Sequence, residues 1–286
     1  MNKIMKNFVR AAAICAVYTC QAVDVAPMLN LNKALLSRYI VEYSTHSKQI
    51  SEDLKKINER KSLYASLIEE FAPKFKEANI EYNGQILNSK RDLLDFLIAH
   101  EYVESKGDIE CISSAGAIGP RQFMPDTAKE WGLENNLYVN ESKNPKKSTK
   151  AALEYLLHYA KAYNHSADLA LAAYNTNPKR IENVLKHNPS IKDDSDIPHG
   201  YLRAETVHYG PKIDALYIML KNPKIYGLNI KSKEIKFEVY TTKKGDTLCR
   251  LAKKFKSDEN LIAKYNGLKN KSRIPLDYSL IIPEIR

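Results

Sequence analysis

The sequence predicts a mainly α-helical protein that ends in a small α+β domain. Apolar residues recur at helical spacing through the first two-thirds of the chain, and no alternating run rich in Val, Ile and Thr occurs before residue 235. The pattern then changes, because Phe237–Thr241 alternates like a strand, two short helical stretches follow, and Ser279–Ile282 resembles a second strand. This βααβ order is typical of a small, separate domain.

Composition and charge describe a soluble globular protein. The chain has 286 residues, of which 44% are hydrophobic and 27% charged, enough for one medium domain and a small one. Its net charge of +10 suits an anionic partner such as a membrane surface or an acidic wall polymer, or reflects a Lys-rich composition with no specific partner. The lysines are scattered and form no single block, so we expect no nucleic-acid partner.

Residues 1–22 have the features of a secretion signal. Three basic residues precede the apolar run Ala11–Tyr18, which is too short to span a bilayer. Cleavage after Ala22 is one outcome, and lipidation of Cys20, with membrane attachment, is another, although the residues before Cys20 match a lipidation site poorly. An uncleaved buried helix is the third possibility.

The elements between the signal and the small domain follow from periodicity and turn signals. Residues 23–85 form an N-terminal helical region, and Asn83-Gly84 marks a turn. We expect a central, buried helix over Lys90–Ser105, since apolar residues cover much of its circumference, and a loop over 106–120. Further helices are predicted from Pro125, over Thr149–Tyr163, over Ala167–Tyr174 and over Pro211–Leu220. The predicted domains are a larger one over 86–225, a Lys-rich linker over 226–236, and the small domain over 237–284.

The cysteines give no sign of a disulfide or a metal site. Cys15 and Cys20 lie in the predicted signal, and Cys111 and Cys249 fall in different predicted domains. No metal-ligand spacing is present, so we expect neither a metal nor another cofactor. The two later cysteines are expected to be packed as small apolar residues.

Glu104 is the candidate catalytic residue. It stands at the C-terminal end of the predicted buried helix, and a glycine-containing loop over 113–119 and a polar-apolar strip over 122–128 follow it. Partial desolvation there is expected to raise the pKa of the carboxyl group, so that it can donate a proton near neutral pH. Glycosidic oxygens leave poorly unless they are protonated. The carboxylate alone favours the alternative, a solvated glutamate at a helix end.

The complete segment resembles the soluble lytic transglycosylase-like domain. The family has a Glu-Ser pair, a Ser-x-x-Gly-Ala-x-Gly loop and a Gln-x-Met-Pro-x-Thr-Ala run, which match Glu104-Ser105, 113–119 and 122–128. Ala172–Asn175 resembles its Ala-Tyr-Asn signature, and 205–213 resembles its late Glu-Thr-x-x-Tyr-x-Pro-Lys segment. Residues 222–228 also resemble the closing run of the membrane-bound transglycosylase D group, so the likeness covers about residues 35–230.

The resemblance implies a lysozyme-like helical fold and an exported enzyme of the periplasm or cell envelope. Its implied reaction cleaves the β-1,4 bond between MurNAc and GlcNAc in peptidoglycan. Glu104 would act alone, first as acid and then as base, while the 6-hydroxyl of the muramic acid attacks and leaves a 1,6-anhydro end. Intramolecular attack is favoured entropically, so the site needs neither a second carboxylate nor a cofactor.

Several residues map onto positions that line the family's sugar cleft. For Tyr174 and Met124 the alternative is core packing, and for Ser113 it is a hydrogen bond within its own loop. Glu101, one turn before Glu104, is expected to make a structural pair or to be solvated. The substrate-binding residues implied by the resemblance are Ser113, Gln122, Met124, Tyr174, Asn175, Glu205 and Tyr209.

Three stretches depart from the family pattern. Ile109 and Cys111 stand where a proline and a small residue are usual, and Pro120-Arg121 replaces an apolar pair, which puts a cation near the cleft. Asn140 begins a run that stands where relatives have an acidic-x-Arg sequence. These changes are expected to alter substrate preference or to weaken activity.

The small C-terminal domain resembles a lysin motif (LysM). Lys244–Leu248, Asn266-Gly267 and Leu280–Pro283 match its pattern. The resemblance implies that the domain binds chains containing N-acetylglucosamine, and Thr247 is placed to cap the first helix. The alternative is a folded appendage that binds nothing. The implied glycan-binding residues are Gly245, Asp246, Thr247 and Leu248.

Two other functions remain open from the sequence. A hydrolase of the lysozyme or chitinase type would need a second carboxylate to activate water, and Glu205 and Glu101 are the candidates. A non-catalytic peptidoglycan-binding protein with a decayed cleft would need none, and the three departures are the features that favour it.

Overall fold

The computed structural model describes residues 28–197 and 200–285, so the predicted signal and Cys20 lie outside the described residues. The chain divides into two compact units. Of the described residues, the first unit comprises 28–52, 72–99, 156–197 and 200–230, and the second comprises 53–71, 100–155 and 231–285. The division falls inside α3 (Ser47–Glu59), α4 (Ser62–Glu77), α5 (Lys90–Ser105) and α7 (Pro145–Ala162).

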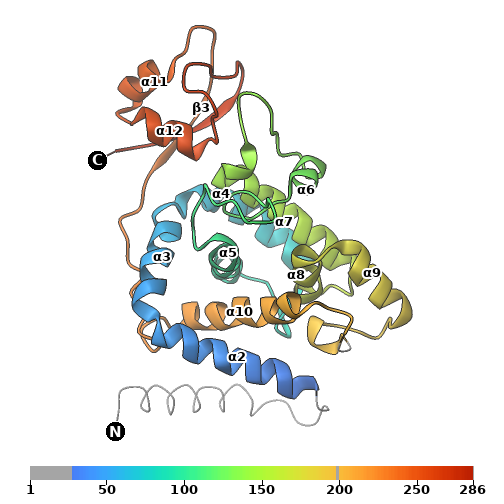
Figure 1. Ribbon diagram of the computed structural model, residues 1–286. Helices are drawn as coiled ribbons and strands as arrows, with labels where there is room; N and C mark the ends of the chain where they lie inside the picture. The colour runs from blue at the N-terminus through green and yellow to red at the C-terminus, as the bar shows by residue number, and fades with distance from the viewer. Residues whose placement is uncertain (1–27, 198–199, 286) are drawn as a thin grey trace. The chain divides into compact units, whose positions relative to one another are not determined.

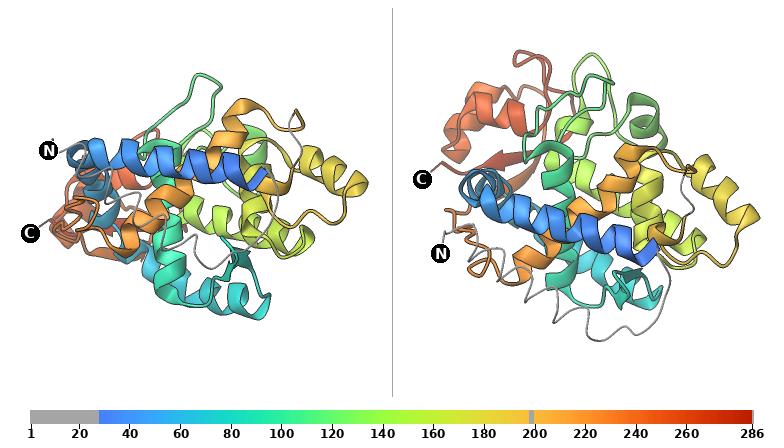
Figure 2. Two further views of the ribbon diagram at one scale, coloured as in Figure 1. Left: turned by 90° about the horizontal axis from the view of Figure 1, so that it is seen from below. Right: turned by 60° about the horizontal axis from the view of Figure 1, so that its bottom comes forward.

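The described part of the first unit is built on helix α10 (Ala204–Lys221). Helix α2 (Met28–Thr45) packs against α10 (Figure 1), and the two helices cross in the views of Figure 2. His208 Nδ1 lies 2.8 Å from the Tyr39 hydroxyl. Helix α8 (Ala167–Asn175) contacts α10 and also α9 (Pro178–His187). Buried side chains hold α8 and α9 together: Tyr163, Leu169, Ala172, Ala173, Ile181, Val184, Ile191 and Ile197.

A hairpin in this unit forms at the predicted Asn83-Gly84 turn. Strand β1 (Glu81–Tyr82) pairs antiparallel with β2 (Gln85–Ile86). Asn83 has φ 51° and Gly84 has φ 68°, which are the positive values that a two-residue hairpin loop requires. The Tyr82 hydroxyl donates to Asp214 Oδ1 at 2.6 Å and ties the hairpin to α10.

In the second unit the segment after α5 folds without regular structure until α6 (Pro125–Glu130) and the 3₁₀ turn η1 (Glu141–Lys143). Gly119 allows this loop to approach the η1 backbone. It has φ +83°, and a Cβ added there would lie 1.8 Å from the Ser142 carbonyl oxygen. Glycine is therefore required at position 119 for both its backbone conformation and the space it leaves.

The end of the chain folds in the predicted βααβ order. Strand β3 (Phe237–Thr241) pairs antiparallel with β4 (Ser279–Pro283), and Val239 lies opposite Ile281. Helices α11 (Leu248–Phe255) and α12 (Glu259–Tyr265) lie between the strands in sequence, as Figure 1 shows. Thr247 caps α11 by accepting from the Arg250 N–H at 3.3 Å, as predicted. The predicted mainly α fold class with a small α+β domain is confirmed.

The core of this small domain also contains Val139, from far earlier in the chain. Val139 is 0% exposed and clusters with Leu251, Ile262 and other apolar residues of the domain. The Asn140 N–H donates to the Gly267 carbonyl at 2.8 Å, and the Tyr278 hydroxyl donates to Glu141 at 2.8 Å. Within the second unit, the small domain is therefore packed against residues 139–141.

The predicted linker is also tied to the second unit by hydrogen bonds. The Ile235 N–H donates to the Glu59 carbonyl at 2.6 Å, and the Ser62 hydroxyl donates to the Ile235 carbonyl at 2.7 Å. These bonds anchor the extended segment at the junction between α3 and α4.

Both later cysteines are free thiols, but they differ in burial. Cys111 is half-buried, whereas Cys249 is exposed on the first turn of α11. The expectation that Cys249 is packed as an apolar residue is therefore wrong, because the buried face of α11 is formed by Leu248, Leu251 and Ala252. Among residues 28–197 and 200–285, no helix has both the length and the apolar character needed to cross a membrane.

Candidate active site around Glu104

Glu104 lies in the last turn of α5, at a point where the chain reverses. Lys106 has φ 53° and Gly107 has φ 77°, and these two left-handed residues end the helix. The Ser105 hydroxyl donates to the Pro120 carbonyl at 3.1 Å, which holds the following loop beside the helix end. The Glu104 side chain is only 12% exposed, in agreement with the partial desolvation expected from the sequence.

Glu101, one turn earlier, is fully buried between two arginines. The Tyr64 hydroxyl donates to Glu101 Oε2 at 2.7 Å, and Arg121 Nη2 lies 3.1 Å from the same oxygen. Arg60 pairs with Glu101 Oε1 and also donates to the Gly107 carbonyl at 2.8 Å. The prediction that Glu101 makes a structural pair is confirmed. Burial, and then the negative charge of Glu101, raise the pKa of the Tyr64 hydroxyl above its usual range.

Arg121 is an interior residue. Its side chain is 0% exposed, and its Nε donates to the Thr149 hydroxyl at 3.1 Å. The expectation that it places a cation at the cleft is therefore wrong, because the guanidinium points into the buried cluster around Glu101. Ile109 and Asn140 are also buried, at 4% and 7% exposure, whereas Cys111, which departs from the pattern beside Ile109, is half-buried.

His100 completes the buried surroundings of Glu104, and sequence reasoning missed it. His100 is 0% exposed, and its Nδ1 lies 3.3 Å from Arg121 Nη1. Its Nε2 lies 3.6 Å from Glu104 Oε1. Burial, and then the charge of Arg121, hold the pKa of His100 well below its usual range, so the imidazole is neutral. The available signal was the i, i+4 spacing of His100 and Glu104 on one helix.

The loop after Glu104 is organised by its own polar side chains. Gln122, at φ 48°, donates from its amide to the Gly119 carbonyl at 2.8 Å and to the Cys111 carbonyl at 3.3 Å. The Ser113 hydroxyl accepts from the Ala117 N–H at 3.0 Å, so the alternative of a hydrogen bond within the loop is confirmed. Both residues hold the loop in shape whether or not they also contact a sugar.

Two side chains of this region lie nearer to solvent. Met124 is 44% exposed just before α6, which contradicts the alternative that it is a core residue. Cys111 is half-buried, and its pKa is raised by burial and then by the negative charges of Asp108 and Glu104. This thiol therefore senses the charge of the candidate acid.

The other predicted sugar-binding residues belong to the first unit. Tyr174 and Asn175 form the end of α8, and both are half-buried. Glu205 is exposed in the first turn of α10. The Thr206 hydroxyl donates to Asn175 Oδ1 at 2.8 Å, which joins the end of α8 to the start of α10. Tyr209 is 5% exposed and lies in the interior, so it offers little surface to a ligand.

In the small domain, three of the four predicted glycan-binding residues form the turn before α11. Gly245 is exposed with φ +89°. Asp246 accepts from the Lys243 N–H at 2.7 Å and from the Tyr240 hydroxyl at 3.0 Å, and the Lys243 bond is the main cause of its lowered pKa. Leu248 is 1% exposed and belongs to the apolar core, so its side chain is a packing group.

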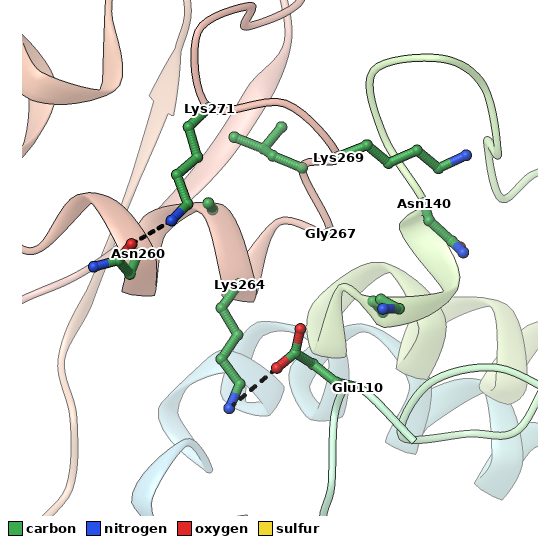
Figure 3. Close-up of a pocket in the computed structure, with 10 residues that line it drawn as sticks. Glu110, Asn140, Asn260, Lys264, Gly267, Lys269 and Lys271 are labelled. Carbon is green, nitrogen blue, oxygen red and sulfur yellow. Dashed lines mark hydrogen bonds and ion pairs between the residues drawn. The ribbon is translucent and has the colours of Figure 1, made fainter. Parts of the chain in front are cut away.

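A lysine-rich cavity of about 340 Å³ lies beside α12 in the same unit (Figure 3). Lys264 lies 3.5 Å from Glu110, and Lys271 donates to Asn260. Asn140, which departs from the family pattern, lines this cavity, whereas none of the predicted sugar-binding residues does. The cavity is therefore separate from the predicted sites. Among the residues that the structure describes, no group of His, Cys, Asp and Glu side chains could hold a metal ion.

Comparison with known families agrees with both resemblances. Residues 79–197 match the family model of the Transglycosylase SLT domain, and residues 240–283 match that of the LysM domain. The chain thus contains an SLT domain followed by a LysM domain.

Among curated proteins, the chain is similar to the membrane-bound lytic murein transglycosylase D of Escherichia coli K12 and to that of E. coli O6:H1 strain CFT073. Each is 31% identical over 151 residues, which is 53% of this chain and 33% of the relative. The chain therefore spans about a third of the length of these relatives.

Solved structures with some similarity are also lytic transglycosylases. The 70 kDa soluble lytic transglycosylase SLT70 of E. coli is 17% identical, with 69% of this chain and 34% of that chain covered and a TM-score of 0.38. An inactive mutant of the lytic transglycosylase Slt of Pseudomonas aeruginosa is 17% identical, with coverages of 72% and 38% and a TM-score of 0.35.

Proposed function

We propose that this chain is a peptidoglycan lytic transglycosylase that cleaves the MurNAc-GlcNAc β-1,4 bond, with Glu104 as its catalytic residue. The observation that carries the proposal is the position of this carboxyl group. Glu104 ends a buried helix inside the segment that matches the SLT domain, and its side chain is 12% exposed. A carboxyl group so far withdrawn from water is suited to proton transfer.

The reaction requires one carboxyl group in two states. Protonated Glu104 donates its proton to the glycosidic oxygen as the C1–O4 bond breaks. The 6-hydroxyl of the same muramic acid then attacks C1, and its proton passes to the Glu104 carboxylate. The products are a 1,6-anhydro end and a free 4-hydroxyl, no water is consumed, and the enzyme returns to its starting state.

The surroundings of Glu101 favour this reaction over hydrolysis. A hydrolase would need a second carboxylate with access to water. Glu101 is 0% exposed and is paired with two arginines, so it cannot activate a water molecule at the substrate. Glu205 is exposed, and as the remaining candidate base it keeps the hydrolase as the second function to test.

The substrate contacts implied by the family stay proposals. Met124 offers exposed apolar surface to a sugar ring, and the Ser113 hydroxyl has a donor left after it accepts from Ala117. Tyr174 and Asn175 at the end of α8 and Glu205 at the start of α10 are proposed as further glycan contacts on the basis of the resemblance.

We assign glycan binding to the LysM domain, through the turn of Gly245, Asp246 and Thr247, in which Gly245 and Thr247 are exposed and Asp246 is half-buried. A binder joined to a catalytic domain raises the local concentration of substrate. The proposed partner is thus the peptidoglycan strand.

The proposed location is the cell envelope. Residues 1–22 are proposed to direct export, followed either by cleavage after Ala22 or by lipidation and membrane anchoring of Cys20. Mass spectrometry of the protein purified from its own envelope, compared with a Cys20→Ser variant, distinguishes the two: a lipid adduct absent from the variant identifies the anchor.

Digestion of purified sacculi tests the activity. We expect wild-type protein to release fragments with anhydro ends. Because no water is added, each is lighter than the hydrolysis product by one water molecule, about 18 Da. Glu104→Gln should lower the rate by about 10²- to 10⁴-fold, the contribution typical of a positioned acid.

Two results would contradict the proposal. Reducing ends without anhydro sugar would establish the hydrolase. Equal inactivity of the wild type and Glu104→Gln, with sacculus binding retained in both, would establish a non-catalytic wall-binding protein.

A further inference from the structure

A line of buried polar side chains connects Glu101 to Glu104 through Arg121 and His100. Arg121 Nη2 lies 3.1 Å from Glu101 Oε2, and Arg121 Nη1 lies 3.3 Å from His100 Nδ1. His100 Nε2 in turn lies 3.6 Å from Glu104 Oε1. Glu101, Arg121 and His100 are all 0% exposed. Ionised groups are costly to bury unless they are paired, and a satisfied buried network is rigid. We therefore expect this line of contacts to hold its side chains in one arrangement.

Arg121 determines which nitrogen of His100 carries the proton. A guanidinium has donors and no acceptor, so Nδ1 of His100 must accept from Arg121 Nη1. The proton of the neutral ring is then on Nε2, the nitrogen that faces Glu104. Protonation of both nitrogens would turn an N–H toward the guanidinium, which the contact with Arg121 opposes.

The charges of the cluster also favour an anion at Glu104. Arg60 and Arg121 are cations, and Glu101 is the single anion between them, so these three groups carry a net charge of one positive unit. Of these two cations, Arg121 is the one whose guanidinium contacts His100, with Nη1 3.3 Å from His100 Nδ1.

We propose that His100, held as its Nε2–H tautomer by Arg121, is a positioning residue that binds Oε1 of Glu104 and leaves Oε2 to carry the catalytic proton. The inference rests on the proposed role of Glu104. In the free protein the 3.6 Å separation is longer than a hydrogen bond, and contacts of this kind tighten when substrate binds. Once Glu104 has donated its proton, the Nε2–H stabilises the resulting carboxylate for the second step.

The other groups near His100 leave this assignment intact. Thr149, on α7, accepts the Arg121 Nε–H and so helps to fix the guanidinium. Cys111 lies near Glu104 and is a neutral thiol at neutral pH, because its pKa is raised. The neutral His100 ring, with the Arg121 cation next to it, therefore supplies positive potential to Glu104.

Carbon-13 NMR on glutamate-labelled full-length protein tests the proposal without relying on activity. The Glu104 carboxyl signal is identified by its absence in Glu104→Gln. His100→Phe keeps a ring but removes the donor, and Arg121→Met removes the cation while keeping an unbranched apolar chain. In both variants we expect the Glu104 signal to titrate at a higher pH, by about one unit, because the carboxylate loses stabilisation.

Tyr64→Phe is the matched control. It removes a buried hydroxyl that donates to Glu101 Oε2 at 2.7 Å, and it keeps the ring that packs against the Arg121 guanidinium. It should lower thermal stability and leave the Glu104 titration unchanged. If folded His100→Phe and Arg121→Met titrate like the wild type, or if Tyr64→Phe shifts the signal equally, the proposal is wrong.

Kinetics on soluble glycan fragments give the second readout. We expect His100→Phe to lower kcat by about 10- to 100-fold with KM nearly unchanged, since a misplaced acid affects the transition state and not binding. His100→Gln, which retains an N–H donor, should recover most of the rate, and failure to recover it would count against a positioning role. Should the wild type cleave no glycan, the proposed function fails, while the titration still decides whether His100 holds Glu104.

Discussion

At the scale of single residues, the same carboxyl chemistry has two outcomes in this chain. Glu101 and Glu104 are one turn apart, yet Glu101 is locked between arginines and Glu104 stays 12% exposed at the helix end. The motif allowed Glu104 to be chosen from the sequence. His100 and Arg121 could not be placed in the same way. An arginine in a loop is expected at the surface unless a buried acidic partner is known, and the sequence does not show that Glu101 is this partner.

A second group of carboxylates predicts a pH-dependent stability. Asp168, Asp194 and Asp214 lie close together in the first unit, and burial, as the largest cause, raises the pKa of each, that of Asp214 to about 6. Ionisation of Asp214 thus costs more in the folded than in the unfolded chain. The contribution of Asp214 to stability is therefore greatest below its unfolded pKa of 3.8 and is lost as pH rises toward 6.

Asp214→Asn should accordingly stabilise the protein at pH 8 by on the order of 2 kcal/mol and have little effect near pH 4. The amide oxygen can still accept from Tyr82, so the hairpin contact is kept. Urea unfolding at the two pH values measures the difference. Asp196→Asn, at an exposed position nearby, is the control and should change neither value. Equal effects of Asp214→Asn at pH 4 and pH 8 would refute the assignment.

At the scale of elements, the helices were predictable where periodicity and caps agree. Helix α5 has the predicted bounds, Lys90 and Ser105. Helix α10 begins at Ala204 and not at Pro211, because the Gly210-Pro211 pair resembles a break but lies inside the helix. Helix α9 was missed, since its ten residues bury only Ile181 and Val184 and the Asn177 cap was not weighed.

The loop after Glu104 gives a prediction at this scale. Gly119→Ala should destabilise the protein by about 2–4 kcal/mol and abolish glycan cleavage, because it combines backbone strain with a steric overlap. An alanine Cβ would lie 1.8 Å from the Ser142 carbonyl oxygen, so the loop that holds Gln122 must move. Urea unfolding and the sacculus assay measure the two effects.

Gly116→Ala is the natural comparison. Gly116 lies in the same loop at φ +88°, but a Cβ there meets no atom within 4 Å. It should cost only about 1 kcal/mol, the strain of the positive φ. The difference between the variants isolates the contact with η1. Similar losses in both variants would show that strain alone explains the effect and that the contact is unimportant.

At the scale of the whole molecule, the second unit joins the LysM fold to an earlier part of the chain. Val139 is buried in the LysM core, and Glu141 accepts from the Tyr278 hydroxyl. The sequence predicted the small domain and its order of elements, but not this insertion. A single apolar residue between polar neighbours has no periodicity, so its partner cannot be read from local pattern.

Val139→Ala should therefore weaken the LysM domain itself. We expect a loss of about 1–2 kcal/mol, since the change leaves a small cavity among α11 and α12 side chains. Hydrogen exchange should be faster at amides of α11 and α12. The mutation is about a hundred residues away in sequence, so a local effect on helix propensity cannot explain this result. Leu137→Ala, at a side chain that is 85% exposed, should leave the same amides unchanged. Unaltered exchange in Val139→Ala would show that Val139 is not part of this core.

The position of Val139 also determines where the chain can be divided when the LysM domain is removed or exchanged. A fragment starting near residue 231 would lack Val139 in its apolar core. A chain that ended before residue 231 would expose Val139 and Asn140 to water. Swapping the LysM domain between relatives would succeed only if residues 139–141 travelled with it. The segment that must be exchanged as a unit is therefore discontinuous. It includes residues 139–141, whereas the match to the LysM family model begins at residue 240.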